Sequence, residues 1–286
     1  MDSKNPVLKT LVYSDIFDFP LKKEEIWIYL ISNKKISKKD FLLSFNEKRI
    51  VSKNNFYFLK GKSKNIKERE KRNKESLIKI KKARKIAKLI SFIPSVYFIG
   101  ITGSLALLSS RRKEDIDIFI ITSKNTIWIT RLFAILLLKT LGVYRKRAEK
   151  DVKDKICLNM IIGENKLSLE KNKQDLYSAH EAVQMLPIFE RNKTYTKFLR
   201  KNSWIKKFLP NALLSKKKIE VPKRNIKMWQ INMLRLLEPI ARKAQYSFMK
   251  KNITIETVTK DFLAFHAVDY RSKILNKFNK KIKKYE

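Results

Sequence analysis

Cysteine is almost absent from the 286-residue chain, whose single cysteine is Cys157. One thiol cannot close an intrachain disulfide, and it cannot supply a cysteine-rich zinc site. Histidine is also scarce: His180 and His266 are the only two, and neither has Cys or His neighbours at ligand spacing. Structural roles are therefore the simpler interpretation for both histidines. The fold must depend on its hydrophobic core, for which a chain of this length is sufficient.

The sequence also lacks a long apolar run free of charges. The longest one, residues 126–144, contains Arg131 and Lys139, and both would be costly inside a bilayer. A buried amphipathic helix is the better interpretation, so we expect neither a membrane span nor a membrane partner. The first residues do not form the apolar stretch of a signal peptide. Together with the lone cysteine, this predicts a cytoplasmic protein.

Acidic residues are few: 27 Asp and Glu face 66 Lys and Arg, which gives a formal net charge of +39. Such an excess attracts polyanions, because basic side chains release counterions from phosphates. Nucleic acid or nucleotide is the partner that this charge suggests. The alternative is a general lysine-rich bias with no specific partner. The hydrophobic fraction of 44% is that of a folded protein.

The first part of the chain, residues 1–61, has the pattern of three short helices followed by a hairpin. Ser37, with Asp40 three positions later, predicts the start of the third helix. Asn54 and Asn55 separate two apolar stretches and tolerate the positive φ of a tight turn. This order outlines a winged-helix module, which would bind RNA or DNA or would serve only in packing or dimerisation. Its candidate nucleic-acid contacts are basic: Lys38, Lys39, Lys48 and Lys53.

The second part, residues 62–174, predicts a small mixed α/β or α+β core. It opens with a helix that has an apolar stripe only beyond residue 74, so we expect residues 62–74 to be a solvated linker extension. The expected strands of the core are residues 96–101, 116–122 and 155–162, with a helix over residues 125–141. The third part, residues 175–286, shows only helical patterns and is expected to be an all-helical domain.

Two aspartates stand at the start of the second strand of this core. Asp115 and Asp117 share one face of the strand because side chains alternate, while Ile116 and Ile118 face the other way. Paired carboxylates suit a hard divalent cation such as Mg²⁺ or Mn²⁺. The turn after the first strand, Gly103-Ser104, offers close backbone approach, a hydroxyl and N–H groups to a phosphate.

Either element alone occurs in many unrelated proteins, but their combination resembles the polymerase-beta-like nucleotidyltransferase superfamily. The shared pattern is an apolar strand, Gly103-Ser104, a short spacer, and Asp115-Ile-Asp117 followed by apolar residues. It covers residues 77–165, and an N-terminal winged helix with a C-terminal helical domain resembles uncharacterised prokaryotic members. The resemblance implies that Ser104 holds the β- and γ-phosphates of a nucleoside triphosphate and that Asp115 and Asp117 ligate Mg²⁺. It further implies transfer of a nucleotidyl group to a hydroxyl on RNA, protein or a small molecule.

The sequence departs from this family at the third metal ligand. The family has a third carboxylate on a later strand, where this chain has Asn159, which is able to offer a carbonyl oxygen but is no base. If the register is different, four other acids are candidates for the role: Asp151, Asp154, Glu164 and Glu181. Three basic residues before Asp115 are candidates for a triphosphate clamp or for solvated loop positions: Arg111, Arg112 and Lys113. The sequence thus predicts a nucleotidyltransferase or, alternatively, a catalytically weakened relative that acts as a nucleic-acid-binding or regulatory module.

Overall fold

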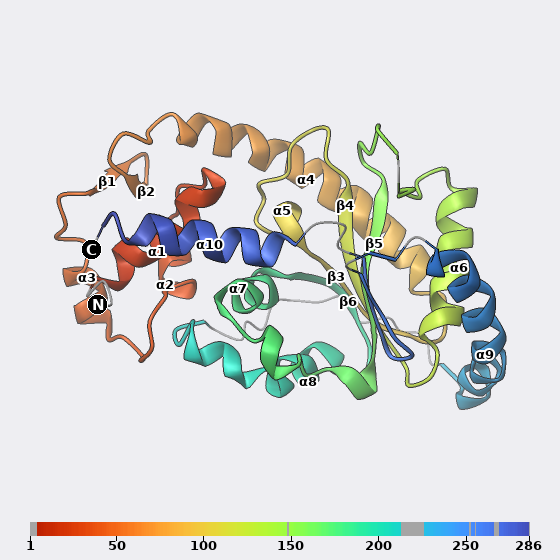
Figure 1. The fold of residues 1–286 in the computed structure, drawn as a ribbon. Helices are drawn as coiled ribbons and strands as arrows, with labels where there is room; N and C mark the ends of the chain where they lie inside the picture. The colour runs from red at the N-terminus through yellow and green to blue at the C-terminus, as the bar shows by residue number, and fades with distance from the viewer. Residues whose placement is uncertain are drawn as a thin grey trace.

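The computed structural model describes residues 5–147, 149–212, 226–251, 253–254, 256–265 and 269–285. Its centre is a six-stranded mixed sheet with the order β6-β3-β4-β5-β8-β7 (Figure 1). The strands are β3 (Val96–Ile101), β4 (Ile116–Thr122), β5 (Ile156–Gly163), β6 (Leu186–Glu190), β7 (Thr257–Val258) and β8 (Phe262–Ala264). The central strands β4 and β5 are parallel, and the other neighbours in the sheet are antiparallel.

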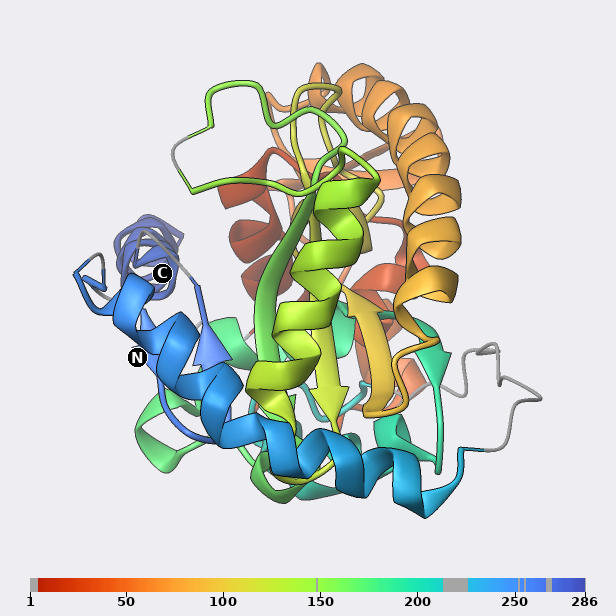
Figure 2. The ribbon, with the colours of Figure 1, turned by 90° about the vertical axis from the view of Figure 1, so that its right-hand side faces the viewer.

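One face of the sheet is covered by helices α4 (Asn65–Ile90) and α6 (Ile127–Thr140), and α9 (Met228–Lys250) packs across the outside of α6 (Figure 2). Apolar residues of all three helices share one buried cluster with the sheet. The carboxylate of Glu238 on α9 accepts hydrogen bonds from the backbone N–H groups of Trp128 and Ile129, at 3.0 and 2.9 Å. Since these N–H groups lie in the first turn of α6, Glu238 satisfies donors that the helix itself cannot.

The other face of the sheet carries a smaller cluster around Phe98 and Phe119, beneath α8 (Thr194–Lys201). Phe98 stacks on Tyr195 of α8, with ring centroids 5.2 Å apart and planes 3° from parallel. Helix α7 (Leu176–Gln184) lies beside α8 on this side, and α5 (Gly103–Ala106) is a single short turn after β3. The expected strands at residues 96–101 and 116–122 are confirmed, and the third expected strand is β5.

The N-terminal part has the element order that its sequence predicts. The elements are α1 (Pro6–Ser14), the 3₁₀ helix η1 (Asp15–Phe17), α2 (Lys23–Ile28), α3 (Lys38–Leu43), β1 (Ile50–Lys53) and β2 (Phe56–Leu59). Ser37 caps α3 by accepting a hydrogen bond from the Asp40 N–H at 3.1 Å, and Asn54 and Asn55 have φ values of 53° and 63°. Three helices and a hairpin are thus present in this order. Their assignment as a winged helix stays a prediction.

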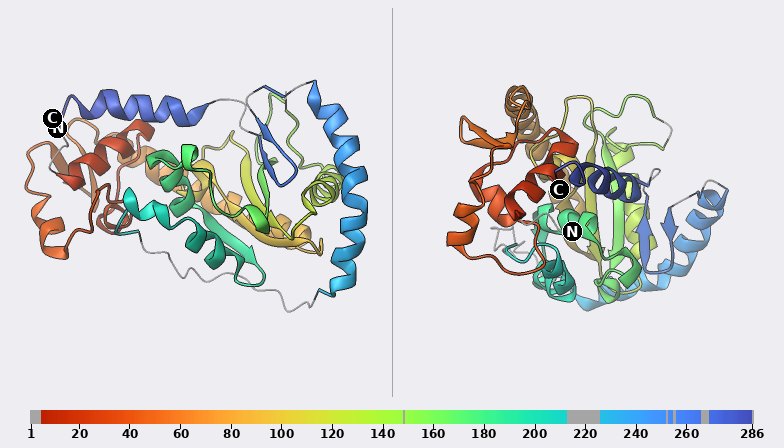
Figure 3. Two further views of the ribbon diagram at one scale, coloured as in Figure 1. Left: turned by 60° about the horizontal axis from the view of Figure 1, so that its bottom comes forward. Right: turned by 60° about the vertical axis from the view of Figure 1, so that its left-hand side comes forward.

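A hydrophobic cluster joins the N-terminal elements to segments far along the chain. The helix α10 (Tyr270–Ile282) lies alongside α1 (Figure 3), and α7 and the 3₁₀ helix η4 (Ser203–Lys207) contribute to the same cluster. Lys281 of α10 forms an ion pair with Asp15. The division of the chain near residues 61 and 174 remains a prediction. The shared cluster means that such units would pack on one another through apolar side chains.

Residues 62–74 are not the solvated linker extension that their charge suggests. Helix α4 begins at Asn65 and continues without a break to Ile90, and Arg69 is only 5% exposed. Its guanidinium donates hydrogen bonds to the Pro20 carbonyl and, at 2.6 Å, to Glu25. It also lies over the ring of Phe19, 4.1 Å from the centroid. The charged segment therefore packs against the N-terminal elements through a buried arginine, which an apolar-stripe criterion does not detect.

The expectation of an all-helical part from residue 175 onward is wrong. The strands β6, β7 and β8 all come from this part and join the central sheet. They are two to five residues long, too short to show the alternation by which a strand is recognised. The expected helix over residues 180–190 ends at Gln184, and β6 follows at the sheet edge, where Pro187 needs no ladder N–H.

Residues 126–144 are the longest apolar run of the sequence. Most of this run forms α6, which packs between the sheet and α9. Within the described ranges, no helix combines the length and the apolar character that crossing a bilayer requires.

Candidate functional site

The two aspartates lie side by side at the start of β4. Ile116 and Ile118 are buried in the cluster beneath α4 and α6, so the alternation of the strand directs Asp115 and Asp117 to the opposite face. In the parallel pairing of β4 with β5, Asp117 is opposite Cys157. One ligand atom from each of Asp115, Asp117 and Cys157 lies within 4.8 Å of the others.

The turn at Gly103 packs directly against this pair of carboxylates. Gly103 has a φ of +64°, and a Cβ atom at this position would lie 3.0 Å from Oδ2 of Asp117. Its predecessor Thr102 donates a backbone hydrogen bond to the Asp117 carbonyl at 3.0 Å. A residue with a side chain at position 103 would therefore meet both an unfavourable backbone conformation and the carboxylate. Glycine is what allows this turn to approach Asp117.

The expected phosphate-holding residue, Ser104, is hydrogen-bonded within the protein. Its hydroxyl donates to Glu114 at 2.7 Å, and the same carboxylate oxygen accepts from the Arg111 N–H at 3.0 Å. Glu114 directly precedes Asp115, so this contact fixes the loop that leads into β4. A phosphate at this turn would have to replace Glu114 as the partner of Ser104. Arg111 meets this carboxylate through its backbone, and no described contact directs its side chain into a phosphate clamp.

Arg145 supplies positive charge next to the aspartates. Its guanidinium lies 3.0 Å from Oδ2 of Asp115 and donates to the Cys157 sulfur at 3.3 Å. Burial, together with the negative charge of Asp115, raises the pKa of Asp117 to about 7. Burial also raises the pKa of Asp115, against the opposing effect of Arg145. The two carboxylates thus disfavour each other's charged form, and a cation between them would relieve the repulsion.

The thiol at this site is not a metal ligand of the usual kind. Burial and the nearby charge of Asp117 raise the pKa of Cys157 well above its ordinary value, so the sulfur stays protonated at neutral pH. A neutral thiol is a poor ligand for a hard cation. The donor set that suits Mg²⁺ or Mn²⁺ therefore consists of the oxygens of Asp115 and Asp117.

Removing Arg145 should strengthen binding of a divalent cation. In Arg145→Met the aspartates lose the positive group that competes for Asp115, and we expect the Mn²⁺ dissociation constant to fall by up to about fivefold, the value of a partly exposed ion pair. Isothermal titration at alkaline pH, where both carboxylates are ionised, measures it. Arg147→Met is the matched control, because Arg147 pairs with Glu256 at 2.8 Å instead. Weaker Mn²⁺ binding in Arg145→Met would contradict this competition.

Asn159, the residue predicted at the third position, lies at a β-bulge. Ile118 pairs with Leu158 and Phe119 with Met160, so Asn159 is an extra residue in β5. As a result Asn159 and Met160 both line a cavity on the aspartate side of the sheet. The Asn159 amide donates to the Thr102 hydroxyl at 3.5 Å. Sequence reasoning named Asn159 and gave Cys157 no role in metal binding, because the opposition of Cys157 and Asp117 depends on strand register.

Of the other acids considered for the third position, Glu181 has the closest electrostatic relation to the aspartates. Burial and the charge of Asp117 together raise the pKa of Glu181 to about 7. Asp154 instead pairs with Lys79 at 3.4 Å, and Glu164 accepts from the Lys124 N–H at 3.2 Å. Asp151 is exposed and accepts from the Lys153 N–H. Among these four acids, Glu181 is therefore the candidate whose charge interacts with that of Asp117.

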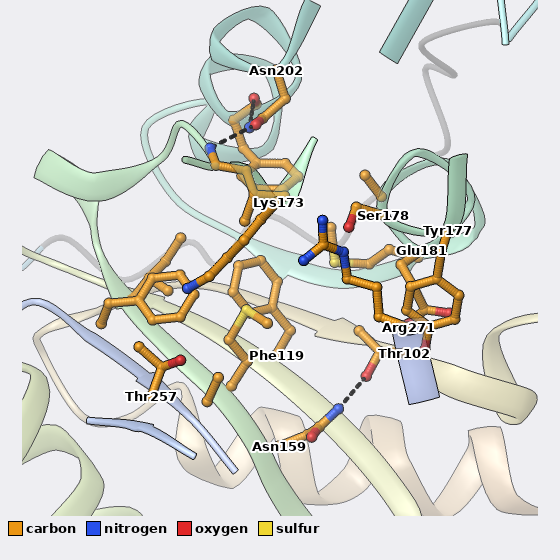
Figure 4. Close-up of a pocket in the computed structure, with 18 of the residues that line it drawn as sticks. Thr102, Phe119, Asn159, Lys173, Tyr177, Ser178, Glu181, Asn202, Thr257 and Arg271 are labelled. Atoms are coloured by element: carbon orange, nitrogen blue, oxygen red, sulfur yellow. Dashed lines mark hydrogen bonds between the residues drawn. The ribbon is translucent and has the colours of Figure 1, made fainter. Parts of the chain in front are cut away.

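A cavity of about 390 Å³ adjoins the aspartate site (Figure 4). It lies between the aspartate face of the sheet and helices α7 and α8, and the start of α10 lines it as well. Thr102, Asn159 and Glu181 belong to its wall. No pattern in the sequence indicates this cavity, because its lining comes from segments separated by more than a hundred residues. His180 packs in the core: its side chain is 3% exposed, and its ring stacks on that of Tyr13. His266 lies outside the described residues.

Comparison of the chain with protein-family models, curated proteins and solved structures gave no match.

Proposed function

We propose that this chain is a nucleotidyltransferase that depends on Mg²⁺ or Mn²⁺ and uses a nucleoside triphosphate as donor. The observation that carries the proposal is the contact between the Gly103 turn and the Asp117 carboxylate, with Asp115 beside it. A phosphate-binding turn and a pair of carboxylates are complementary parts of a site for a metal-bound triphosphate. Phosphate and metal would thus meet at one point.

Asp115 and Asp117 would hold the cation, which supplies positive charge against the triphosphate when bound. The Gly103 turn lets the backbone approach the phosphates, and Ser104 would exchange Glu114 for a phosphate oxygen. The acceptor hydroxyl oxygen forms a bond to the α-phosphorus while the bond from that phosphorus to the β-phosphate oxygen breaks. Pyrophosphate leaves, and the hydroxyl proton passes to a carboxylate of the site or to water.

The direct test is transfer of label from each of the four α-³²P-labelled ribonucleoside triphosphates. The full chain is incubated with Mg²⁺ and, separately, with cellular RNA, protein and a small-molecule extract. We expect one of these fractions to acquire label in a reaction that chelator abolishes. Absence of nucleotide and metal binding under the same conditions would remove the enzymatic proposal and leave the binding function described below.

Two variants distinguish Cys157 from Asn159 as the residue at the third ligand position. In Cys157→Asp a carboxylate would replace a sulfur within 4.8 Å of both aspartates, so we expect Mn²⁺ to bind about tenfold more tightly and transfer to accelerate. Asn159→Asp should give this gain if the sequence-based assignment is right. Mn²⁺ titrations and transfer rates of Cys157→Asp and Asn159→Asp show which of the two residues occupies the third ligand position. Cys157→Ser, which adds no charge, is the control and should leave Mn²⁺ affinity nearly unchanged.

A second function is favoured by the net charge of +39 and by the neutral thiol opposite Asp117. In this case a weakened nucleotidyltransferase fold would act as a nucleic-acid-binding or regulatory module of the cytoplasm, with RNA or DNA bound at its basic N-terminal elements. Lys38 and Lys39 are exposed on α3, and Lys53 is exposed in the hairpin. Affinity for a duplex should then fall steeply with salt and should weaken in Lys38→Glu. Affinity that is indifferent to salt would contradict this function.

A further inference from the structure

The cavity beside the aspartates has a group of polar residues at one end, and the rest of its wall is of mixed character. The polar end contains Thr102, Asn159 and Glu181, with Tyr177 and Ser178 of α7 nearby (Figure 4). The rest of the wall contains many apolar side chains, with the aromatic residues Phe119, Phe198, Trp204, Phe262 and Tyr270, and also the cations Lys166, Lys173 and Arg271. A molecule that fills the cavity must therefore combine a polar group with an apolar body.

The polar end lies next to the proposed reaction site. Thr102 directly precedes Gly103, and its hydroxyl accepts the hydrogen bond from Asn159. Asp117, whose Oδ2 packs against Gly103, also influences the pKa of Glu181 and that of Tyr177, and both of these residues line the cavity. Through Thr102, the polar end of the cavity therefore lies beside the turn that packs against Asp117.

The walls of the cavity are held in place by hydrogen bonds. The Asn202 side chain donates to the Leu167 carbonyl at 2.7 Å and accepts from Leu169 N–H at 3.0 Å and Trp204 Nε1 at 2.9 Å. At the other side, Arg271 forms an ion pair with Asp175, the capping residue of α7. These contacts fix the loop at Leu167 and Leu169, the helix η4 and the start of α10 around the cavity. The cavity is thus formed in the folded chain, as is usual for small-molecule sites.

The chemistry and the volume of the cavity exclude the triphosphate and limit the second reactant to a small molecule. Two of the three cations in the wall already have carboxylate partners: Arg271 pairs with Asp175, and Lys173 pairs with Glu170 at 3.4 Å. A triphosphate in the cavity would lose its hydration without enough free charged partners, so the phosphates belong at the Gly103 turn. A volume of about 390 Å³ lies in the range of small-molecule sites. A folded RNA or protein surface would instead contact the basic exterior. The cavity fits the part of a small reactant that carries no phosphate.

We propose that this cavity binds the acceptor, and that the acceptor is a small alcohol or phenol with an aromatic or alkyl body. The proposal rests on the nucleotidyltransferase function above and specifies the substrate class for the same site. The acceptor hydroxyl lies at the polar end, where its oxygen forms the bond to the α-phosphorus as pyrophosphate leaves. The proton passes to the Glu181 carboxylate. The apolar body packs against Phe119 and the other aromatic side chains.

The test uses 2-naphthol as a probe, with 2-methylnaphthalene as the analogue that lacks the hydroxyl. Saturation-transfer NMR and fluorescence titration measure binding of both to the full chain, and Mg-ATP binding is measured separately. Ala182 lines the cavity, so Ala182→Trp fills it. We expect this change to weaken 2-naphthol binding by at least about tenfold and to leave Mg-ATP binding unchanged. The matched control is Ala244→Trp, at an exposed position of α9, which should bind 2-naphthol like the unmodified chain.

Four results would overturn the acceptor assignment. If Ala182→Trp binds 2-naphthol normally, or if 2-methylnaphthalene binds as well as 2-naphthol, the cavity does not recognise a hydroxylated reactant. If 2-naphthol and Mg-ATP compete and Ala182→Trp loses both, the cavity holds the nucleobase. If 2-naphthol binds in the cavity but no nucleotide binds the protein, the proposed function fails while the cavity stands as a site. Ala182→Leu repeats the comparison if near-ultraviolet circular dichroism shows that Ala182→Trp is not folded.

Discussion

Asp117→Asn and Asp115→Asn should each lower nucleotidyl transfer by about a hundredfold or more. Each change removes one of the two negative ligands that have to hold the cation against water. The fold should survive, because the half-buried Asp117 lies beside another carboxylate and loses a repulsion when it becomes an amide. Initial rates with saturating Mg²⁺, together with a Mn²⁺ titration of each variant, measure the effect.

The control for these substitutions is Asp151→Asn. Asp151 is exposed, and its described hydrogen bond is to a backbone N–H in its own loop. Its replacement should leave both transfer and Mn²⁺ affinity unchanged. If Asp115→Asn and Asp117→Asn bind Mn²⁺ as tightly as the unmodified chain does, the metal lies elsewhere. The assignment of the site would then be wrong even if transfer were found.

The arrangement of the aspartates could be predicted because it depends on local features. The residues of β4 are β-branched or aromatic apart from Asp117, and alternation along one strand puts Asp115 and Asp117 on one face. Gly103 follows a buried strand and has the positive φ that its residue type allows. Ser37 caps α3 in the same local way. Such features need no knowledge of the rest of the chain.

The contribution of Cys157 and the adjoining cavity could not be predicted because they depend on distant segments. Cys157 meets Asp117 only through the parallel register of β4 and β5, and Asn159 leaves the expected alternation because of a bulge. The cavity is lined by residues of β5, α7 and the start of α10. It is also lined by β8, a strand too short to show a clear periodicity. The buried Arg69 was missed for a related reason, since its stabilising partners lie in the preceding elements. Register and tertiary packing decide these positions.

His180 should make the protein sensitive to acid. Its ring is 3% exposed, stacked on Tyr13 with centroids 4.2 Å apart, and tilted toward Tyr29 at 5.9 Å. Its Nδ1 lies 3.2 Å from the Gln184 amide nitrogen. Burial lowers the pKa of His180 from 6.5 to about 3. Between these two values the unfolded chain binds a proton that the folded chain excludes, so stability is lost as pH falls through this window.

The expected loss from this one residue is about 3 kcal/mol between neutral pH and about pH 4.5, since each unit of pKa difference corresponds to about 1.4 kcal/mol. His180→Phe preserves an aromatic ring against Tyr13 and cannot be protonated, so its free energy of unfolding should fall less steeply with acid. Urea denaturation at a series of pH values gives the slope, which is the readout even if His180→Phe shifts stability at neutral pH. The control is Phe248→His, which adds a histidine at an exposed position of α9 and should retain the slope of the unmodified chain. Equal slopes for His180→Phe and the unmodified chain would show that His180 takes up its proton without unfolding, and the contact between α7 and α1 would then have to admit water.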